Sequence, residues 1–196
     1  LWRWCIDESF RTKSGLRWGL DQQIANRMPL RGQHLASNMS AEQMWIAGEW
    51  CDAEDGATAD ILNPATGEVM ATTPKATIAD VNRCVEASRA ALNDASWKAM
   101  DPAQRGRILN KMAQATYANA KALAAIESNN NGKTFREALS EIRYGAWTLE
   151  YFAGVSEKIE ERTFPGPGNR LNYAVRQPRG VTVHIVPWNF PLQLAL

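Results

Sequence analysis

Three consecutive helix-start signals limit what this chain can fold into more than any other feature of its sequence. They are capping boxes at residues 77–80, 101–104 and 134–137, with Asp, Gln and Glu respectively at the third helical position. In the second box a proline follows the capping aspartate, and proline is favoured at the first position of a helix. The sequence therefore predicts helices that begin at residues 78, 102 and 135.

Apolar residues recur at helical spacing behind each signal and predict which face of each helix is buried. The second helix is expected to run unbroken to residue 131, because Gly132 suits the left-handed residue that follows a helix. The expected stripes are Ile78, Val81, Val85 and Leu92 with Cys84 beside them; Ile108, Met112, Ala115, Ala122 and Ile126; and Ile142, Ala146, Leu149 and Ala153.

Short strands are predicted on either side of these helices. Residues 45–50 indicate two strand pieces around a turn at Gly48, and residues 61–71 indicate a hairpin whose turn reads Asn-Pro-Ala-Thr-Gly. Residues 172–176 and the more apolar residues 181–186 are two further predicted strands.

The charge balance and the cysteine count exclude several classes of protein. The 196 residues carry a net charge of +1, from 22 Lys and Arg against 21 Asp and Glu, so neither nucleic acid nor a membrane is expected as a partner. Every apolar run is shorter than the roughly 20 residues that span a bilayer. The distant Cys5, Cys51 and Cys84 argue against a disulfide framework or a metal site, and favour a reducing compartment.

Residues 1–38 differ from the rest and are expected to be a disordered leader outside the fold. Met39 is followed by Ser40, which suggests a natural start there and an over-extended reading frame or an added sequence before it. A mitochondrial presequence is the alternative, against which the acidic Asp7 and Glu8 count. At the other end, an apolar segment has only begun at Leu192 when the chain stops, so the end is interpreted as a truncation.

Taken by themselves, the residues show no self-contained active site. His34 lies in the leader, and His184 is expected to have a structural role inside a strand. Cys84 is interpreted as a small core residue, and Cys51 has no neighbouring histidine or helix N-terminus that would activate its thiol. The sequence has no G-x-G-x-x-G, P-loop or G-x-S-x-G motif.

One local feature could serve chemistry, namely residues 187–191, which read Pro-Trp-Asn-Phe-Pro at the end of the predicted strand. Two prolines stiffen this loop, and ligands of open α/β sheets bind beyond the carboxyl ends of the strands. Asn189 could offer an uncharged NH₂ donor to an oxyanion there. On these five residues alone, a plain turn with an aromatic plug is the simpler interpretation.

An ordered set of motifs over about residues 44–196 resembles the NAD(P)-dependent aldehyde dehydrogenase family. Residues 176–192 resemble the signature that runs from R-E-P-x-G-V into P-W-N-F-P, although Gln177, Arg179 and residues 182–184 depart from its usual residues. The other matches are residues 46–50 with I-x-G-x-W, 63–69 with N-P-A-T-G-E, 105–109 with R-x-x-x-L, 127–133 with E-x-x-x-x-G-K, and 151–154 with Y-[YF]-A-G.

The resemblance implies an α/β fold, of which residues 44–196 form the N-terminal part of the aldehyde dehydrogenase type. The three helices and the strand from residue 181 would belong to its Rossmann-like cofactor domain. The early hairpin and residues 172–176 would belong to its oligomerising part. In the family, a cysteine thiolate attacks an aldehyde, an asparagine amide and a backbone N–H hold the oxyanion, hydride passes to the nicotinamide, and a glutamate activates water to hydrolyse the thioester.

Asn189 matches the oxyanion asparagine of the family. The residues that match the nicotinamide end of its cofactor site are Ile185, Val186, Pro187, Trp188 and Asn189. The implied ligands are NAD or NADP and a small aldehyde, and Trp188 favours the hydrolytic branch over the CoA-acylating one. A homo-dimer or homo-tetramer is implied, in the cytoplasm or, if residues 1–38 are a presequence, in the mitochondrial matrix.

The nucleophilic cysteine, the E-L-G-G glutamate and the K-P lysine of the family all lie downstream of the matched region. None of them is among these 196 residues, so the chain by itself is expected to be inactive. A non-catalytic remnant that associates with intact subunits is the alternative. A helical structural domain with an accidental likeness is a third, which the ordered motifs disfavour.

Overall fold

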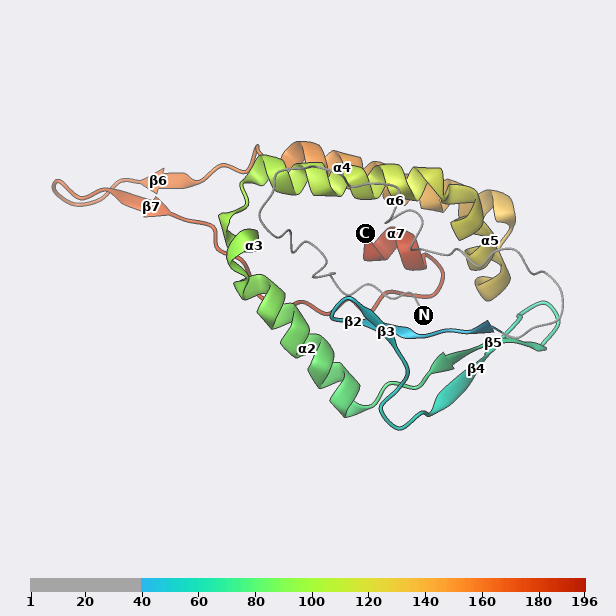
Figure 1. The fold of residues 1–196 in the computed structure, drawn as a ribbon. Coiled ribbons are helices and arrows are strands. Elements are labelled where there is room, and N and C mark those ends of the chain that lie inside the picture. Colours follow the sequence, from blue (N-terminus) through green and yellow to red (C-terminus); the bar gives the residue numbers. More distant parts are fainter. Residues whose placement is uncertain (1–39) are drawn as a thin grey trace, which may run out of the picture.

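The computed structural model describes residues 40–196, so the predictions for residues 1–38 lie outside the described residues. Figure 1 shows a layer of helices above several short strands. The strands are β1 Ser40–Ala41, β2 Met44–Ile46, β3 Glu49–Cys51, β4 Thr58–Leu62, β5 Val69–Pro74, β6 Arg162–Phe164 and β7 Asn172–Ala174. The helices are α2 Ile78–Asn93, α3 Ala95–Ala99, α4 Pro102–Ala118, α5 Ala120–Asn131, α6 Phe135–Val155 and α7 Pro191–Ala195.

Both early hairpins are confirmed. Strands β2 and β3 pair antiparallel around Ala47 and Gly48, whose φ angles are 53° and 84°. Positive φ at both turn residues matches the twist of the flanking strands. Strands β4 and β5 pair antiparallel across the second turn, where Gly67 has φ 74°, and β1 lies parallel to β5.

The start of α2 is fixed by the predicted capping box and by a buried carboxylate. Asp80 is almost fully buried and accepts hydrogen bonds from Thr77 N (2.9 Å) and from Glu54 N (3.2 Å), which ties the helix to the loop after β3. The hydrogen bond from the Thr77 backbone is the largest cause of a lowered Asp80 pKa, because it stabilises the charged carboxylate.

The apolar stripe predicted for α2 is only partly buried. Cys84 packs with Cys51 against the small cluster of Met44, Ile46 and Ala53, as expected of a core cysteine. Ile78 and Val81, in contrast, are 82% and 54% exposed, so the prediction that they are buried is wrong for the described residues. Within that part of the chain, their face of the helix has no sheet or helix packed over it.

The helix predicted as unbroken from 102 to 131 is two helices, and this prediction is corrected. Asn119 ends α4 with φ −102° and ψ 9°, and its side chain donates to the carbonyl of Ala115 (2.8 Å). Asparagine competes for backbone hydrogen bonds in this way and so favours helix ends. The break turns α5 onto α6, and it leaves Ile126 46% exposed rather than in a buried stripe.

The main core lies where α6 packs against α4, α5 and α7 (Figure 1). The third capping box is confirmed at Thr134 and Glu137, and the predicted stripe of α6 is buried at Ile142, Ala146 and Leu149. The members of the largest cluster are Ala120, Ala124, Ala138, Ile142 and Leu192, with Leu123, Leu139 and Leu196 packed beside them. Helix α7 is therefore held on α6 through Leu192.

Helices α4 and α6 leave no room for a side chain at Gly106, which predicts opposite effects of two glycine substitutions. A Cβ at Gly106 would lie 2.4 Å from Ser156 Oγ and 2.8 Å from the carbonyl oxygen of Ala153. Gly106→Ala is expected to lower the free energy of unfolding by about 1–3 kcal/mol, because the helices must separate. Gly154→Ala, in α6 with open space around it, is expected to raise that free energy by about 0.5–1 kcal/mol. Urea denaturation of both variants checks this, and equal signs would contradict it.

The segment after α6 differs from the prediction in one respect. Strands β6 and β7 form an antiparallel arm that projects from the helices, and β7 confirms most of the strand predicted at 172–176 (Figure 1). Residues 181–186 form no strand, because no described segment lies beside them to complete a hydrogen-bonded ladder. Their backbone continues outside any sheet, with Val183 76% exposed.

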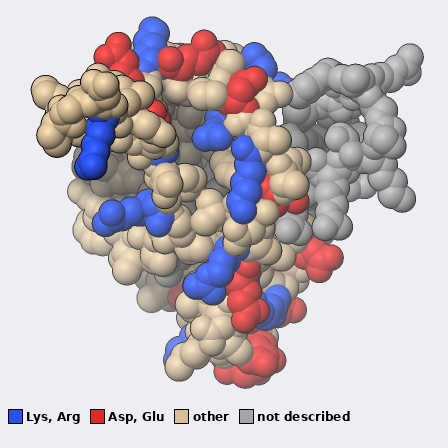
Figure 2. Space-filling model, turned by 90° about the vertical axis from the view of Figure 1, so that its left-hand side faces the viewer, with Lys and Arg blue, Asp and Glu red and all other residues tan. Residues whose placement is uncertain are grey.

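Basic and acidic side chains alternate over the face of the molecule seen in Figure 2, without a large area of one sign. Among residues 40–196, no helix combines the length and the apolar character that crossing a bilayer requires.

Candidate functional site

Asn189 lies in the loop between residues 181–186 and α7, and α7 anchors the C-terminal end of this loop. Pro191 is the first residue of α7, where a missing N–H is tolerated. One residue later, Leu192 is 2% exposed within the main core. Asn189 itself is exposed, three residues before this buried anchor.

Two side chains from the end of α5 hold the carbonyl groups on either side of Asn189. The Nδ2 of Asn131 donates to the carbonyl oxygen of Trp188 (3.1 Å), and the Nζ of Lys133 donates to the carbonyl oxygen of Asn189. The residues joined by these two bonds are 57 and 56 positions apart in the sequence. The loop is thus placed by long-range polar contacts as well as by its prolines.

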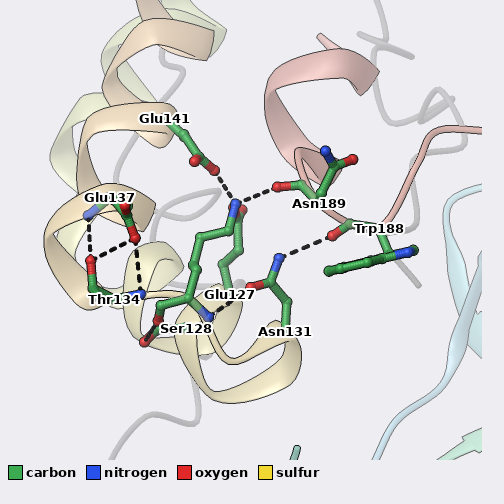
Figure 3. Close-up of polar contacts among 9 residues, drawn as sticks. Glu127, Ser128, Asn131, Thr134, Glu137, Glu141, Trp188 and Asn189 are labelled. Carbon is green, nitrogen blue, oxygen red and sulfur yellow. Dashed lines mark hydrogen bonds and ion pairs between the residues drawn. The ribbon is translucent and has the colours of Figure 1, made fainter.

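Lys133 is the centre of a polar cluster. Its Nζ lies 2.9 Å from Glu127 Oε1 on α5 and also contacts Glu141 Oε2 on α6. Figure 3 shows the Glu141 carboxylate and the Asn189 carbonyl pointing toward the same nitrogen. The Lys133 ammonium also lies 4.9 Å from the centre of the Phe190 ring, within the range of a cation–π contact.

The cluster combines two carboxylates with one ammonium in a poorly hydrated place. Glu127 is 1% exposed, and its Oε2 has no hydrogen-bond partner among the described residues. Burial raises the pKa of Glu127, and its hydrogen bond from Lys133 only partly offsets that effect. Burial also opposes the charge of Lys133, but the hydrogen bonds to Glu141 and Glu127 outweigh it, so the pKa of Lys133 is raised.

A tight turn presents Lys133 to the loop. Gly132 adopts φ 85° after α5, as predicted for a residue that ends a helix in the left-handed region. The backbone N–H of Lys133 donates to Asn131 Oδ1 (2.9 Å), and the hydroxyl of Ser128 donates to the carbonyl of Lys133 (2.7 Å). The position of the lysine backbone is therefore fixed by the end of its own helix.

An open hollow of about 400 Å³ lies beside this cluster. It is lined by Asn131, Gly132, Lys133, Glu137, Glu141, Trp188, Asn189 and Phe190. The side-chain amide of Asn189 points away from the lysine cluster (Figure 3) and makes no hydrogen bond to another described residue. A donor with free hydrogen atoms is what binding an oxyanion requires.

The other predicted cofactor residues form one continuous run that leads into this loop. Ile185 is 93% exposed and Trp188 76% exposed, while Val186 is half-buried and Pro187 exposed. The run presents apolar side chains and backbone groups without a charged residue. Such a surface suits the flat, uncharged end of a ligand more than its phosphates.

The remaining candidates for chemistry lie apart from the loop. His184 is exposed rather than inside a strand, and its Nε2 lies 3.4 Å from Thr182 Oγ1. Cys51, in β3, accepts a hydrogen bond from Arg83 of α2 (3.5 Å). Among residues 40–196, no group of three or more His, Cys, Asp and Glu side chains is arranged to hold a metal ion.

The lysine cluster was missed as a functional feature in the sequence. In the sequence, Glu127, Gly132 and Lys133 stand out only as a helix end that matches a family motif, and Glu141 does not stand out at all. The available signal was the unusual place of a Glu and a Lys around a helix-ending glycine. What the sequence could not reveal is that Glu127 and Glu141 hold Lys133 against Asn189 and Phe190.

The comparisons with known proteins agree on one class of enzyme, the dehydrogenases. A profile described as "Aldehyde dehydrogenase family" matches residues 50–196. "Aldehyde dehydrogenase, cytosolic 1" of Mus musculus is 40% identical over 152 residues, which cover 76% of this chain and 30% of that protein. Glutarate-semialdehyde dehydrogenase of Pseudomonas putida is also 40% identical over 152 residues, covering 76% of this chain and 31% of that protein.

Solved structures give the same answer. The crystal structure of an NAD-dependent aldehyde dehydrogenase from Sinorhizobium meliloti superposes with a TM-score of 0.76 at 38% identity, over 81% of this chain and 32% of that one. The chain belongs to the aldehyde dehydrogenase family, and its fold is the N-terminal part of the family fold. It spans about a third of the length of the curated relatives that it matches.

Proposed function

We propose that this chain is the N-terminal part of an NAD(P)-dependent aldehyde dehydrogenase subunit, and that Asn189 is an oxyanion donor of its active site. The observation that carries the proposal is the placement of Asn189. Its backbone is held by Asn131 and Lys133, while its amide stays free beside a hollow. A polar group that is positioned but unpaired is typical of a binding or catalytic role.

In the proposed reaction the Asn189 amide donates a hydrogen bond to the aldehyde oxygen as that oxygen becomes negative. The backbone that carries the donor is already held by Asn131 and Lys133, which reduces the free energy spent on reorganisation when the charge develops. Residues 185–188 would lie along the nicotinamide end of NAD or NADP, and the bound cofactor would supply the hydride acceptor. The exposed Ile185 and Trp188 fit that role, because an apolar wall excludes water from a hydride transfer.

The nucleophilic cysteine and the general-base glutamate of the proposed subunit would come from its downstream part. We assign residues 44–196 to the cofactor-binding region, together with the strands that would join subunits into a homo-dimer or homo-tetramer. A small aldehyde is the proposed substrate, and the cytoplasm is the proposed location, or the mitochondrial matrix if residues 1–38 are a presequence.

An assay of the complete subunit tests this function. The coding sequence is first read beyond Leu196, and the complete subunit is then purified and offered short and aromatic aldehydes with NAD⁺ or NADP⁺. Formation of reduced nicotinamide is expected with the complete subunit and not with residues 1–196 alone. A complete subunit that reduces neither cofactor with any aldehyde overturns the proposal. A stop codon after Leu196, with co-purification of the chain and an intact subunit, would support a non-catalytic remnant instead.

A further inference from the structure

The proposed reaction gives Lys133 no direct role. Its side chain contacts neither the side-chain amide of Asn189 nor the side chains of residues 185–188. We propose that Lys133, held by Glu127 and Glu141, is a positioning residue that sets the direction of the Asn189 side chain. This inference rests on the proposed function of Asn189 as an oxyanion donor. The inference concerns the orientation of the Asn189 amide and not its ligand.

The geometry follows from the two carbonyl groups that flank the Asn189 Cα. Asn131 Nδ2 holds the carbonyl of Trp188 at 3.1 Å, and Lys133 Nζ holds the carbonyl of Asn189. Each peptide unit is planar, so holding its carbonyl oxygen limits how far the whole unit can turn. With both peptide units restrained, φ and ψ of Asn189 are restrained, and the direction of its Cα–Cβ bond is restrained with them.

Lys133 can do this because every hydrogen atom of its ammonium group has an acceptor. A lysine has three donors, and the three acceptors are Glu127 Oε1, Glu141 Oε2 and the carbonyl oxygen of Asn189. They come from α5, from α6 and from the loop respectively. The flexible Lys133 side chain is thereby held at one point, and the position of the loop depends on the positions of α5 and α6.

Stability by itself does not account for such a cluster. Glu127 is 1% exposed, one of its oxygen atoms has no partner among the described residues, and a second carboxylate lies nearby. Replacing buried ion pairs by apolar groups is often neutral or stabilising, so their retention favours a role in position rather than in stability. The position that this cluster determines is that of residues 188–190.

The test is Lys133→Met in the complete subunit, since methionine keeps much of the stem and removes all three donors. The expected result is a fall in kcat of about 10- to 100-fold with a much smaller change in the KM for the cofactor, because a misplacement of about 1 Å can cost that much in rate. Lys121→Met is the matched control, because Lys121 is an exposed lysine of α5, the helix that ends just before Lys133. It is expected to leave kcat unchanged.

A double-mutant cycle separates positioning from a general structural effect. If Lys133 acts through Asn189, then Lys133→Met is expected to lower kcat less than twofold in a subunit that already carries Asn189→Ala. A full further loss in that background overturns the inference while leaving the role of Asn189 intact. If Asn189→Ala itself does not lower kcat, the proposed function fails, and that outcome is distinct from the first.

A second variant covers the case in which Lys133→Met does not fold. Asn131→Asp keeps the acceptor for the backbone N–H of Lys133 and replaces the donor to the carbonyl of Trp188. It is expected to lower kcat in the same way and to be equally silent in the Asn189→Ala background. An Asn131→Asp subunit with unchanged kcat and unchanged thermal stability would contradict the proposed placing of the loop by its two carbonyl contacts.

Discussion

Replacing Asn189 by Ala in the complete subunit is expected to lower kcat by about 10²–10³-fold, the usual cost of losing one oxyanion donor. Affinity for the cofactor is expected to change little, because the contacts of residues 185–188 would be largely made by backbone and apolar surface. The loop itself should stay in place, since Asn131 and Lys133 hold carbonyl groups that alanine retains. Steady-state kinetics together with a cofactor titration measure both effects.

Two further substitutions sharpen this result. Asn189→Asp has nearly the same shape but no NH₂ donor, and it places a negative charge where one would develop, so it should be at least as slow as Asn189→Ala. Asn110→Ala removes an exposed asparagine of α4 and serves as the control. Turnover of Asn189→Ala equal to that of the unmodified subunit would refute the oxyanion role.

Replacing Ile142 by Ala is expected to lower the free energy of unfolding by about 2–5 kcal/mol. Ile142 is fully buried and contacts the cluster that also holds Leu192, so its loss leaves a cavity beneath α7. Because Leu192 follows the Asn189 loop by three residues, some loss of activity should accompany the loss of stability. Urea denaturation followed by circular dichroism measures the first effect.

Ile78→Ala is the matched control, since it removes the same atoms from a side chain that is 82% exposed. It is expected to change the free energy of unfolding by no more than about 0.5 kcal/mol. Similar losses in the two variants would mean that a further part of the protein covers α2, and would show that exposure within these residues is a poor guide to the complete subunit.

The features that sequence predicted correctly are those decided by a few neighbouring residues. The capping boxes at Thr77, Asp101 and Thr134 need only four residues each, and all three mark helix starts. The turn at Gly48 likewise depends on local backbone freedom. Features of this kind can be predicted without knowledge of how the helices and strands pack.

The predictions that failed depended on distant parts of the chain. An apolar stripe continues past Asn119, so the break between α4 and α5 is visible only once α5 is seen to pack against α6. Residues 181–186 have the composition of a strand, but a strand exists only where a partner lies beside it. The helical spacing of Ile78 and Val81 indicates that they share one face of α2. It does not indicate whether another element covers that face.

The candidate site shows the same division. Asn189 was predicted through a motif of neighbouring residues, and its role stays a prediction. The cluster that holds the loop joins Lys133 to Glu127 and Glu141, six and eight residues away, and to Asn189, 56 residues away. No spacing rule connects those last two residues, because their contact depends on how α6 and α7 pack.

The shared ammonium group of Lys133 also constrains how this protein can change over evolutionary time. Loss of the lysine alone would leave the buried Glu127 and its neighbour Glu141 without a counter-charge, and loss of Glu127 alone would release the lysine from its place. A protein that has lost only one of these residues is therefore expected to be less fit than one that keeps all three or has replaced all three. The three positions are expected to change together or not at all, so that two helices and the Asn189 loop are inherited as one unit.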